Sequence, residues 1–227
     1  MVNIKKYFLQ LGFTKLKIDE FLAKNFMRAG YSHVDVIKTP LGTRVIIYAD
    51  RPALIIGRRG QTIRQLTEIF QKYFGLENPQ ITVTQVENPD LNARIVASRI
   101  ALAIERGYHF RRAAYVALRR ILAAGAIGAE IVISGKLTSE RARYEKIRAG
   151  KVYKTGAHVE RLVERAVIHL LRKPGMYGIQ VLIVKAGEPD DIVRIKTPEE
   201  VSKEVSTQEC QTESATSSGE DRRGGTS

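Results

Sequence analysis

Two glycines separated by two arginines form the first group in this sequence whose spacing suggests chemistry. The segment reads Ile55-Ile56-Gly57-Arg58-Arg59-Gly60. Glycines let a backbone turn sharply and approach another chain closely, and the amides that open a following helix attract anions. The guanidinium groups of Arg58 and Arg59 add forked donors that match phosphate oxygens. The segment therefore predicts non-covalent contact with a phosphate-bearing backbone, although Gly-x-x-Gly alone also fits a plain connection between helices.

A second cationic group lies on the helix expected over residues 110–124. Arg112, Tyr115 and Arg119 fall on one face at helical spacing, flanked by Arg111 and Arg120, and the segment contains no acidic residue. A surface that serves only solubility usually mixes both signs of charge. We therefore predict that these four arginines bind phosphates, while Tyr115 stacks on a base or shields the helix. The opposite, apolar face consists of Phe110, Ala113, Ala114, Ala117, Leu118 and Ile121.

A third cationic group lies on a long connection, which we expect over residues 136–151. Its acidic residues are Glu140 and Glu145 alone. Long loops of this kind are often functional, although a flexible, solvated excursion is the alternative interpretation. We predict that the connection binds RNA or a neighbouring protein. Its basic residues are Lys136, Arg141, Arg143, Lys146, Arg148 and Lys151.

The charge of the whole chain points to the same class of partner. The 227 residues carry a formal net charge of +13, but the residues from Thr197 onward hold three basic and seven acidic side chains, a net −4, which leaves +17 on residues 1–196. Such an excess favours a polyanion, either nucleic acid or an anionic membrane. Because no apolar run approaches the length of a membrane span and no signal peptide is evident, we expect a soluble, intracellular protein bound to nucleic acid.

The residues that usually hold metals or perform catalysis are scattered. Cys210 is the single cysteine, and the histidines His33, His109, His158 and His169 lack metal-ligand spacing. Gly135-Lys136 is followed by Leu137, so the chain has no phosphate-binding loop for a nucleotide. The pair Asp190-Asp191 is more consistent with a solvated turn than with a magnesium site. We therefore expect no metal, no cofactor and no catalytic residue.

The elements that hold the first loop follow from hydrophobic periodicity and turn residues. The pattern predicts a helix over residues 15–29, a hairpin turning at residues 40–42, a short helix after Asp50, a helix from Gly60 to Phe74 and a strand over residues 81–86. Glu87-Asn88-Pro89-Asp90 then marks a domain boundary.

A second α+β unit is expected after this boundary. Helices are predicted over residues 91–106 and 110–124, and strands over 129–134, 179–185 and, more weakly, 152–155. Residues 158–172 read as an amphipathic helix stopped by Pro174-Gly175. We therefore divide the chain into an N-terminal extension (1–14), two α+β domains (15–88 and 89–196) and an acidic tail (197–227) too poor in apolar residues to fold.

The predicted order of elements around the glycine loop resembles the type II KH fold, whose Gly-x-x-Gly loop clamps a few nucleotides of an RNA backbone. Further segments, in the same order along residues 15–185, are similar to the S-three family of small-subunit ribosomal proteins, and their details are archaeal-type. These segments are Gly75-Leu76-Glu77-Asn78-Pro79, Phe110-Arg111-Arg112-Ala113, Ser134-Gly135-Lys136-Leu137 and Glu140-Arg141-Ala142.

The resemblance implies a ribosome-bound, cytoplasmic protein in the head of the small subunit. Its KH domain would contact ribosomal RNA and neighbouring head proteins, and its second domain would line the channel where mRNA enters. Arg111 and Arg112 correspond to the family's paired arginines on that channel. Bacterial members carry a lysine where this chain has Tyr115, so support for opening structured mRNA would fall to Arg119 and the basic connection. The resemblance implies no membrane contact and no homo-oligomer.

Two other functions remain possible at the level of sequence. KH modules also occur in nucleic-acid-processing enzymes, which would require catalytic residues that this chain does not mark out. A free-standing KH regulator of single-stranded RNA would need only the first domain, whereas the second domain has basic surfaces of its own. Sedimentation separates such a regulator from a ribosomal protein, because the regulator floats free of ribosomal subunits at moderate salt and the ribosomal protein travels with them.

Overall fold

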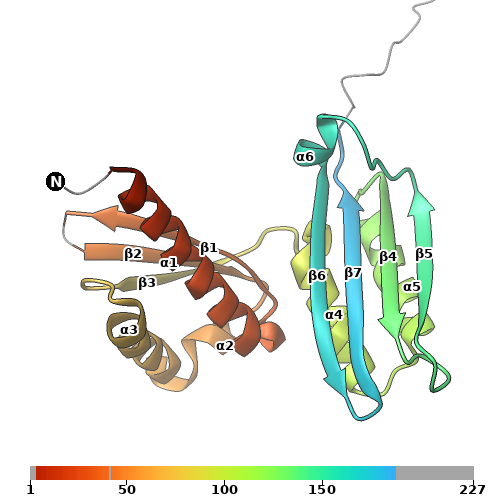
Figure 1. The fold of residues 1–227 in the computed structure, drawn as a ribbon, viewed down its shortest axis with the longest axis horizontal. Helices are drawn as coiled ribbons and strands as arrows, with labels where there is room; N and C mark the ends of the chain where they lie inside the picture. The colour runs from red at the N-terminus through yellow and green to blue at the C-terminus, as the bar shows by residue number, and fades with distance from the viewer. Residues whose placement is uncertain (1–3, 41, 188–227) are drawn as a thin grey trace, which may run out of the picture. The chain divides into compact units, whose positions relative to one another are not determined.

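The computed structural model describes residues 4–40 and 42–187 of the chain. Both sheets in this part carry helices, so the α+β class predicted from the sequence is confirmed (Figure 1). One sheet has three strands in the order β1-β2-β3, and the other has four in the order β5-β4-β7-β6. The elements are taken below in these two groups.

The three-stranded sheet is built around β2. Strand β1 (Tyr31–Thr39) pairs with β2 (Gly42–Ala49) in antiparallel fashion, and β3 (Gln80–Gln85) pairs with β2 in parallel. The helices are α1 (Ile4–Asn25), the 3-10 turn η1 (Met27–Ala29), α2 (Pro52–Ile56), the 3-10 turn η2 (Arg58–Gly60) and α3 (Gln61–Phe74). The helix, strand, strand, helix, loop, helix, strand order predicted for a KH fold is therefore the order observed.

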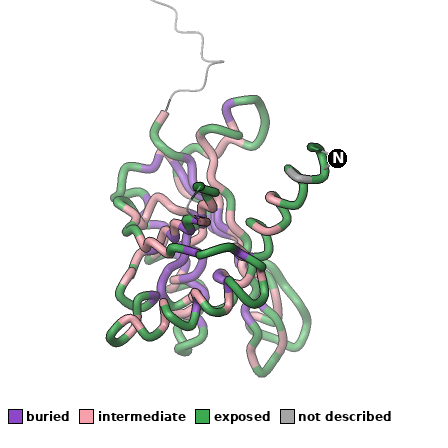
Figure 2. The backbone as a smooth tube through the Cα atoms, turned by 90° about the vertical axis from the view of Figure 1, so that its left-hand side faces the viewer, coloured by how far each residue is buried: buried purple, intermediate pink, exposed green. Residues whose placement is uncertain are grey.

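The core of this group lies between the helices and one face of the sheet. Ile18 and Leu22 of α1 and Phe70 of α3 are fully buried there, together with Ile55 of α2. Burial of each such side chain contributes about 1.5–3 kcal/mol. The helix predicted over residues 15–29 has other bounds in the structure, because α1 begins at Ile4 and ends at Asn25. Its first turns are exposed in Figure 2.

The four-stranded sheet is antiparallel throughout and is covered on one face by two helices (Figure 1). Helix α4 (Ala93–Glu105) follows the 3-10 turn η3 (Pro89–Leu91), and α5 (Phe110–Ala123) follows α4. The strands are β4 (Gly128–Gly135), β5 (Arg143–Gly150), β6 (Val163–Arg172) and β7 (Gly175–Val184), with the short helix α6 (His158–Leu162) before β6. The apolar face predicted for α5 is confirmed: Phe110, Ala114, Leu118 and Ile121 are buried, and Ala113 and Ala117 pack against them.

Three predictions about this half of the chain are wrong. The helix expected over residues 158–172 ends at Leu162, and strand β6 follows it and pairs with β7 along its whole length. No strand forms at residues 152–155. The connection expected over residues 136–151 contains the edge strand β5, paired with β4 from Gly135↔Arg143 to Gly128↔Gly150. The predicted disordered tail lies outside the described residues, and the domain bounds stay predictions.

The segment between the two groups of elements is fixed by hydrogen bonds. The side-chain oxygen of Asn92 accepts bonds from the amides of Arg94 and Ile95 and so caps α4. Arg94 donates two bonds of 2.9 Å to the carboxylate of Asp19 on α1 and one of 3.0 Å to the carbonyl oxygen of Ser32. The side chain of Arg94 therefore holds the start of α4 against α1 and β1.

Asp19 also accepts a 2.6 Å hydrogen bond from the hydroxyl of Tyr31. Burial raises the pKa of Asp19, but the hydrogen bonds from Arg94 and Tyr31 outweigh it and leave the pKa below its ordinary value. Burial and the same Asp19 carboxylate raise the pKa of Tyr31 far above its ordinary value. The carboxylate is therefore ionised and the phenol protonated at neutral pH.

Candidate nucleic-acid interface

The glycine loop begins with a conformation that only glycine adopts readily. Gly57 ends α2 with φ 73° and ψ 179°, and its amide donates a 3.0 Å bond to the carbonyl oxygen of Ala53. A Cβ atom placed on Gly57 would lie 2.1 Å from Oγ1 of Thr62. Both the backbone angle and the contact with α3 therefore require glycine at this position.

The tip of the loop is exposed. Arg58 and Arg59 are both exposed, and Arg59 has a left-handed backbone, with φ 54° and ψ 27°. Gly60 is also left-handed, but a Cβ there would meet nothing within 4 Å. Within residues 4–40 and 42–187, neither arginine has a carboxylate partner. The loop therefore presents two uncompensated guanidinium groups, an arrangement suited to phosphate groups.

The arginines of α5 are exposed as predicted, but they are not all free. Nε of Arg111 donates a 2.6 Å bond to Oε1 of Glu145 on β5. The prediction that four arginines stand free is therefore wrong for Arg111. Arg112, Arg119 and Arg120 have no ion pair with any described residue. These three guanidinium groups remain available to an external anion.

The predicted basic connection is divided by the geometry of β5. Successive side chains of a strand point to opposite faces of the sheet. On β5, Arg143 and Glu145 lie on the face that is covered by α5. Lys146 and Arg148 lie on the opposite face, which carries no helix. Lys136 and Arg141 precede the strand. The structure therefore does not bring all of the predicted basic residues to one surface.

Lys146 is also engaged by an acid that the sequence interpretation did not single out. Glu130 of β4 is buried, and its carboxylate lies 3.1 Å from Nζ of Lys146 and 3.2 Å from Nζ of Lys154. Burial raises the pKa of Glu130, but the bonds from the two lysines outweigh it and leave the pKa below its ordinary value. Glu130 in turn raises the pKa of Lys146. Lys146 is therefore held as a cation on the sheet face that carries no helix.

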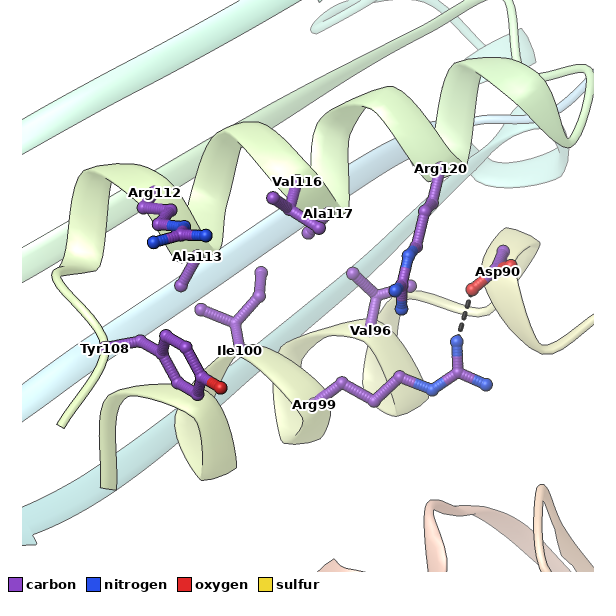
Figure 3. Close-up of a pocket in the computed structure, with 10 residues that line it drawn as sticks. All are labelled: Asp90, Val96, Arg99, Ile100, Tyr108, Arg112, Ala113, Val116, Ala117 and Arg120. Atoms are coloured by element: carbon purple, nitrogen blue, oxygen red, sulfur yellow. Dashed lines mark hydrogen bonds and ion pairs between the residues drawn. The ribbon is translucent and has the colours of Figure 1, made fainter. Parts of the chain in front are cut away.

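A groove of about 320 Å³ lies between α4 and α5 (Figure 3). Its apolar lining comes from α4 and α5, and the groove is edged by polar side chains at both ends. Figure 3 shows Tyr108 and Arg112 at one end and Arg99, bonded to Asp90, with Arg120 at the other. The apolar lining consists of Val96, Ile100, Ala113, Val116 and Ala117.

Comparison with known proteins bears out the family and the two domain types predicted from the sequence. Residues 17–91 match the family model described as KH domain, and residues 100–183 match the model described as ribosomal protein S3, C-terminal domain. The small ribosomal subunit protein uS3 of Hyperthermus butylicus is 65% identical over 201 residues, which cover 88% of this chain and 81% of the relative. The chain belongs to the uS3 family.

Other archaeal members of the uS3 family give the same result. The protein of Saccharolobus solfataricus is 57% identical over 206 residues, covering 91% of this chain and 90% of the relative. The protein of Aeropyrum pernix is 59% identical over 199 residues, covering 88% of this chain and 81% of the relative. The KH domain and the S3 C-terminal domain therefore follow one another in this chain as the resemblance implied.

Neither a metal centre nor a membrane span is found among the described residues of this uS3 family member. No group of three or more His, Cys, Asp or Glu side chains within residues 4–40 and 42–187 is arranged to hold a metal ion. In the same part of the chain, no helix is long and apolar enough to cross a membrane.

Several residues of the interface were missed by the sequence interpretation. Glu130 and Lys154 meet only because β4 and the segment after β5 are neighbours in the fold. Tyr108 stands after Gly107, at a turn between helices, and nothing in its spacing connects it with Val96 or Ile100. A local pattern cannot reveal a groove formed by two helices. The position of Tyr108 between two arginine-bearing helices could nevertheless have marked it as a candidate RNA-binding residue.

Proposed function

We propose that this chain is a structural, RNA-binding constituent of the small ribosomal subunit, located in the head. The loop at residues 57–60 contacts ribosomal RNA, and the exposed face of α5 lines the channel where mRNA enters. The observation that carries the proposal is the presence of unpaired arginines both on the loop at residues 57–60 and on α5, in a chain of the uS3 family. Two such surfaces suit a protein that holds several RNA segments at once.

The contact with mRNA is assigned to Arg112, Arg119 and Arg120. Arg111 contributes less in this structure because Glu145 neutralises it. Tyr115 is 53% exposed on the same helix, between Arg112 and Arg119. A tyrosine at this position offers a stacking surface in place of a charge, so the arginine that follows one turn later supplies the cation.

The partners follow from the same assignment. They are ribosomal RNA, mRNA and neighbouring proteins of the head, and the protein is ribosome-bound in the cytoplasm. A protein neighbour finds a suitable surface on the first turns of α1, where Leu9, Phe13 and Leu16 are exposed. A catalytic role is not part of the proposal, because the uS3 family is structural. The proposal includes no cofactor, no membrane contact and no homo-oligomer.

Sedimentation of tagged chains expressed in cells tests the proposal. The parent chain should travel with small subunits through a gradient at moderate salt, whereas a free-standing regulator would remain at the top.

The variant with both Arg58→Glu and Arg59→Glu should bind RNA about tenfold or more weakly. The slope of its log affinity against log salt concentration should be shallower by about 1.4–1.8.

A charge-matched control is available on the same KH domain. Lys24→Glu with Lys72→Glu reverses the same number of charges at exposed positions near the ends of α1 and α3. This variant should keep the parent's salt slope. If both double variants change the slope equally, binding depends on net charge alone and the loop is not the RNA-binding site. If the parent chain stays at the top of the gradient, the ribosomal assignment is wrong.

A further inference from the structure

We propose that the groove between α4 and α5 binds one unpaired nucleobase of an RNA strand, with the flanking phosphates held by Arg112 and Arg120. The proposal rests on the RNA-binding function proposed above and adds a base-binding site to it. A site of this kind responds to the presence of a base, and not only to the charge of the backbone.

The groove has the size and lining that a single base needs. Its volume of about 320 Å³ lies at the lower end of the range of about 300–1,000 Å³ typical of ligand sites. Val96 and Ile100 line it from α4, and Ala113 and Ala117 line it from α5. The small alanines keep the space between the helices open. A double helix would not enter a hollow of this size, whereas bases of single-stranded RNA are commonly splayed into pockets.

Tyr108 supplies a stacking surface at one end of the groove. Its side chain is 52% exposed, and its amide donates a 3.1 Å bond to the carbonyl oxygen of Ala103. Gly107, with φ +98°, allows the chain to turn there between α4 and α5. Figure 3 shows the tyrosine ring beside Ile100, facing the apolar lining. Stacking on an aromatic ring tolerates any base, since every base has a π-face.

Cations stand at both ends of the groove. Arg112 and Arg120 lie eight positions apart on α5, which places their Cα atoms about 12 Å apart along the helix axis. Neither has an ion pair with a described residue. Arg99, in contrast, is held at the wall by Asp90 and by Asp50 at 3.1 Å. A nucleotide lying between the two unpaired arginines would have a guanidinium group near each of its phosphates.

A second hollow continues the positive surface beyond Arg120. It has a volume of about 340 Å³ and shares Arg99 and Arg120 with the groove. Further arginines also line it, and Asp50 is its one carboxylate. A strand that leaves the groove at this end therefore meets cations over its next phosphates. The additional arginines are Arg28, Arg51 and Arg106.

RNA accounts for this surface better than an apolar side chain of a neighbouring protein. Such a side chain would fill the apolar lining but would leave Arg112 and Arg120 dehydrated without an anion, which is costly. A nucleotide satisfies both requirements, because its base is apolar on its faces and its phosphates are negative. The groove and the arginines at its ends are therefore complementary to one chemical class.

Fluorescence anisotropy with two labelled strands tests the proposal on the full chain. One strand is an oligoadenylate decamer, and the other is a ribose-phosphate decamer of equal length and charge that carries no bases. The affinity for oligoadenylate divided by the affinity for the base-free strand measures the contribution of the bases to binding. Tyr108→Ala should lower this ratio about tenfold, and Tyr108→Phe should keep it. Arg120→Ala should weaken the binding of both strands by the same factor.

Tyr73→Ala is the matched control, since Tyr73 is 81% exposed on α3 and lies outside the groove. It should leave the ratio at the parent's value. An unchanged ratio in Tyr108→Ala, with oligoadenylate still bound, would overturn the base site and leave the proposed function intact. If the parent binds neither strand, the RNA-binding function itself is wrong and the base site falls with it.

Photocrosslinking supplies a second measurement that does not depend on a variant. A decamer containing 4-thiouridine, bound to the parent chain and irradiated, should attach to the peptide that contains Tyr108. Attachment confined to peptides around residues 57–64 would contradict the base site while agreeing with RNA binding by the loop.

Discussion

The arginines of α4 and most of those of α5 lie on neighbouring helices but differ in whether a carboxylate pairs with them. Arg94 binds Asp19 through two hydrogen bonds of 2.9 Å, and Arg99 pairs with both Asp50 and Asp90. Arg112, Arg119 and Arg120 have no carboxylate partner in the described chain. Arg94 and Arg99 therefore stabilise the fold, and the three unpaired arginines of α5 are left to bind a partner.

The difference shows why local charge is a poor guide to the role of an arginine. The partner of Arg94 lies 75 positions away in the sequence, on α1. The partner of Arg111 lies 34 positions away, on β5. Only the fold brings these acids to their arginines. A segment without acidic residues can thus still contain a neutralised arginine, as α5 does.

The largest expected effect comes from breaking the pair that holds α4 to α1. Arg94→Ala should lower the free energy of unfolding by about 3 kcal/mol, because it leaves the partly buried carboxylate of Asp19 without its cation. Arg119→Ala should change that free energy by less than about 0.5 kcal/mol, since its side chain is exposed and unpaired. Urea unfolding of both variants measures the contrast, and equal losses would contradict it.

A smaller effect is expected from acid. The pKa of Asp19 and that of Glu130 both lie below their ordinary values of 3.8 and 4.5 in the folded chain, so the unfolded chain binds more protons. Their contribution to stability is complete above those ordinary values and is lost as pH falls through the lower, folded pKa values. Asp19→Asn should reduce this acid dependence by about 1–2 kcal/mol.

The measurement is urea unfolding of parent and variant from about pH 6 down to about pH 2. The two curves of unfolding free energy should converge at the acidic end, where the Asp19 carboxylate of the parent is protonated. Curves that stay parallel over the whole range would show that Asp19 is not stabilised as a carboxylate by Arg94.

The α5 arginines should affect binding in place of stability. Arg112→Ala with Arg119→Ala removes two phosphate contacts, so the salt slope for a single-stranded RNA should become shallower by about 1.4. The affinity at moderate salt should fall about threefold to tenfold. Anisotropy titrations at several salt concentrations measure both values. A loss of stability with an unchanged salt slope would show that these arginines stabilise the fold, as Arg94 and Arg99 do, and do not bind RNA.

The smallest effect concerns the arginine of α5 that is paired. Glu145→Gln should release Arg111 and strengthen binding to single-stranded RNA about twofold, a change that fits the low energy of an exposed ion pair. Glu140→Gln removes the same charge from the same region and should have less effect, because Glu140 is exposed and pairs with no described residue. Equal gains in both variants would indicate a general charge effect.

The sequence was a reliable guide where local pattern decides the structure. The apolar face of α5 and the glycine loop between α2 and α3 follow from residue spacing, and the structure confirms both. Strand β6 was mistaken for a helix because Val163, Ala166, Val167 and Leu170 recur at helical spacing. The same segment also alternates, with Ala166, Ile168 and Leu170 on its core side. Pairing with β7 decides between these patterns, and local periodicity does not contain that information.

The candidate site was predictable in its cations and less so in their surroundings. Arg58, Arg59, Arg112 and Arg119 are exposed, as their positions on a loop tip and a polar helix face require. The pairing of Lys146 with Glu130 and the groove beside Tyr108 depend on contacts between distant segments. Residue types thus identify candidate cations, and the fold decides which of them remain uncompensated.

The position of β5 at the edge of its sheet affects how the protein behaves before it binds RNA. An edge strand exposes unpaired amides and carbonyls, which can recruit a strand from another molecule and start aggregation. Here that edge carries Arg143, Lys146 and Arg148, so two copies approaching edge to edge would repel one another. Some of the side chains that are suited to binding a polyanion therefore also protect the free protein from aggregation with other copies.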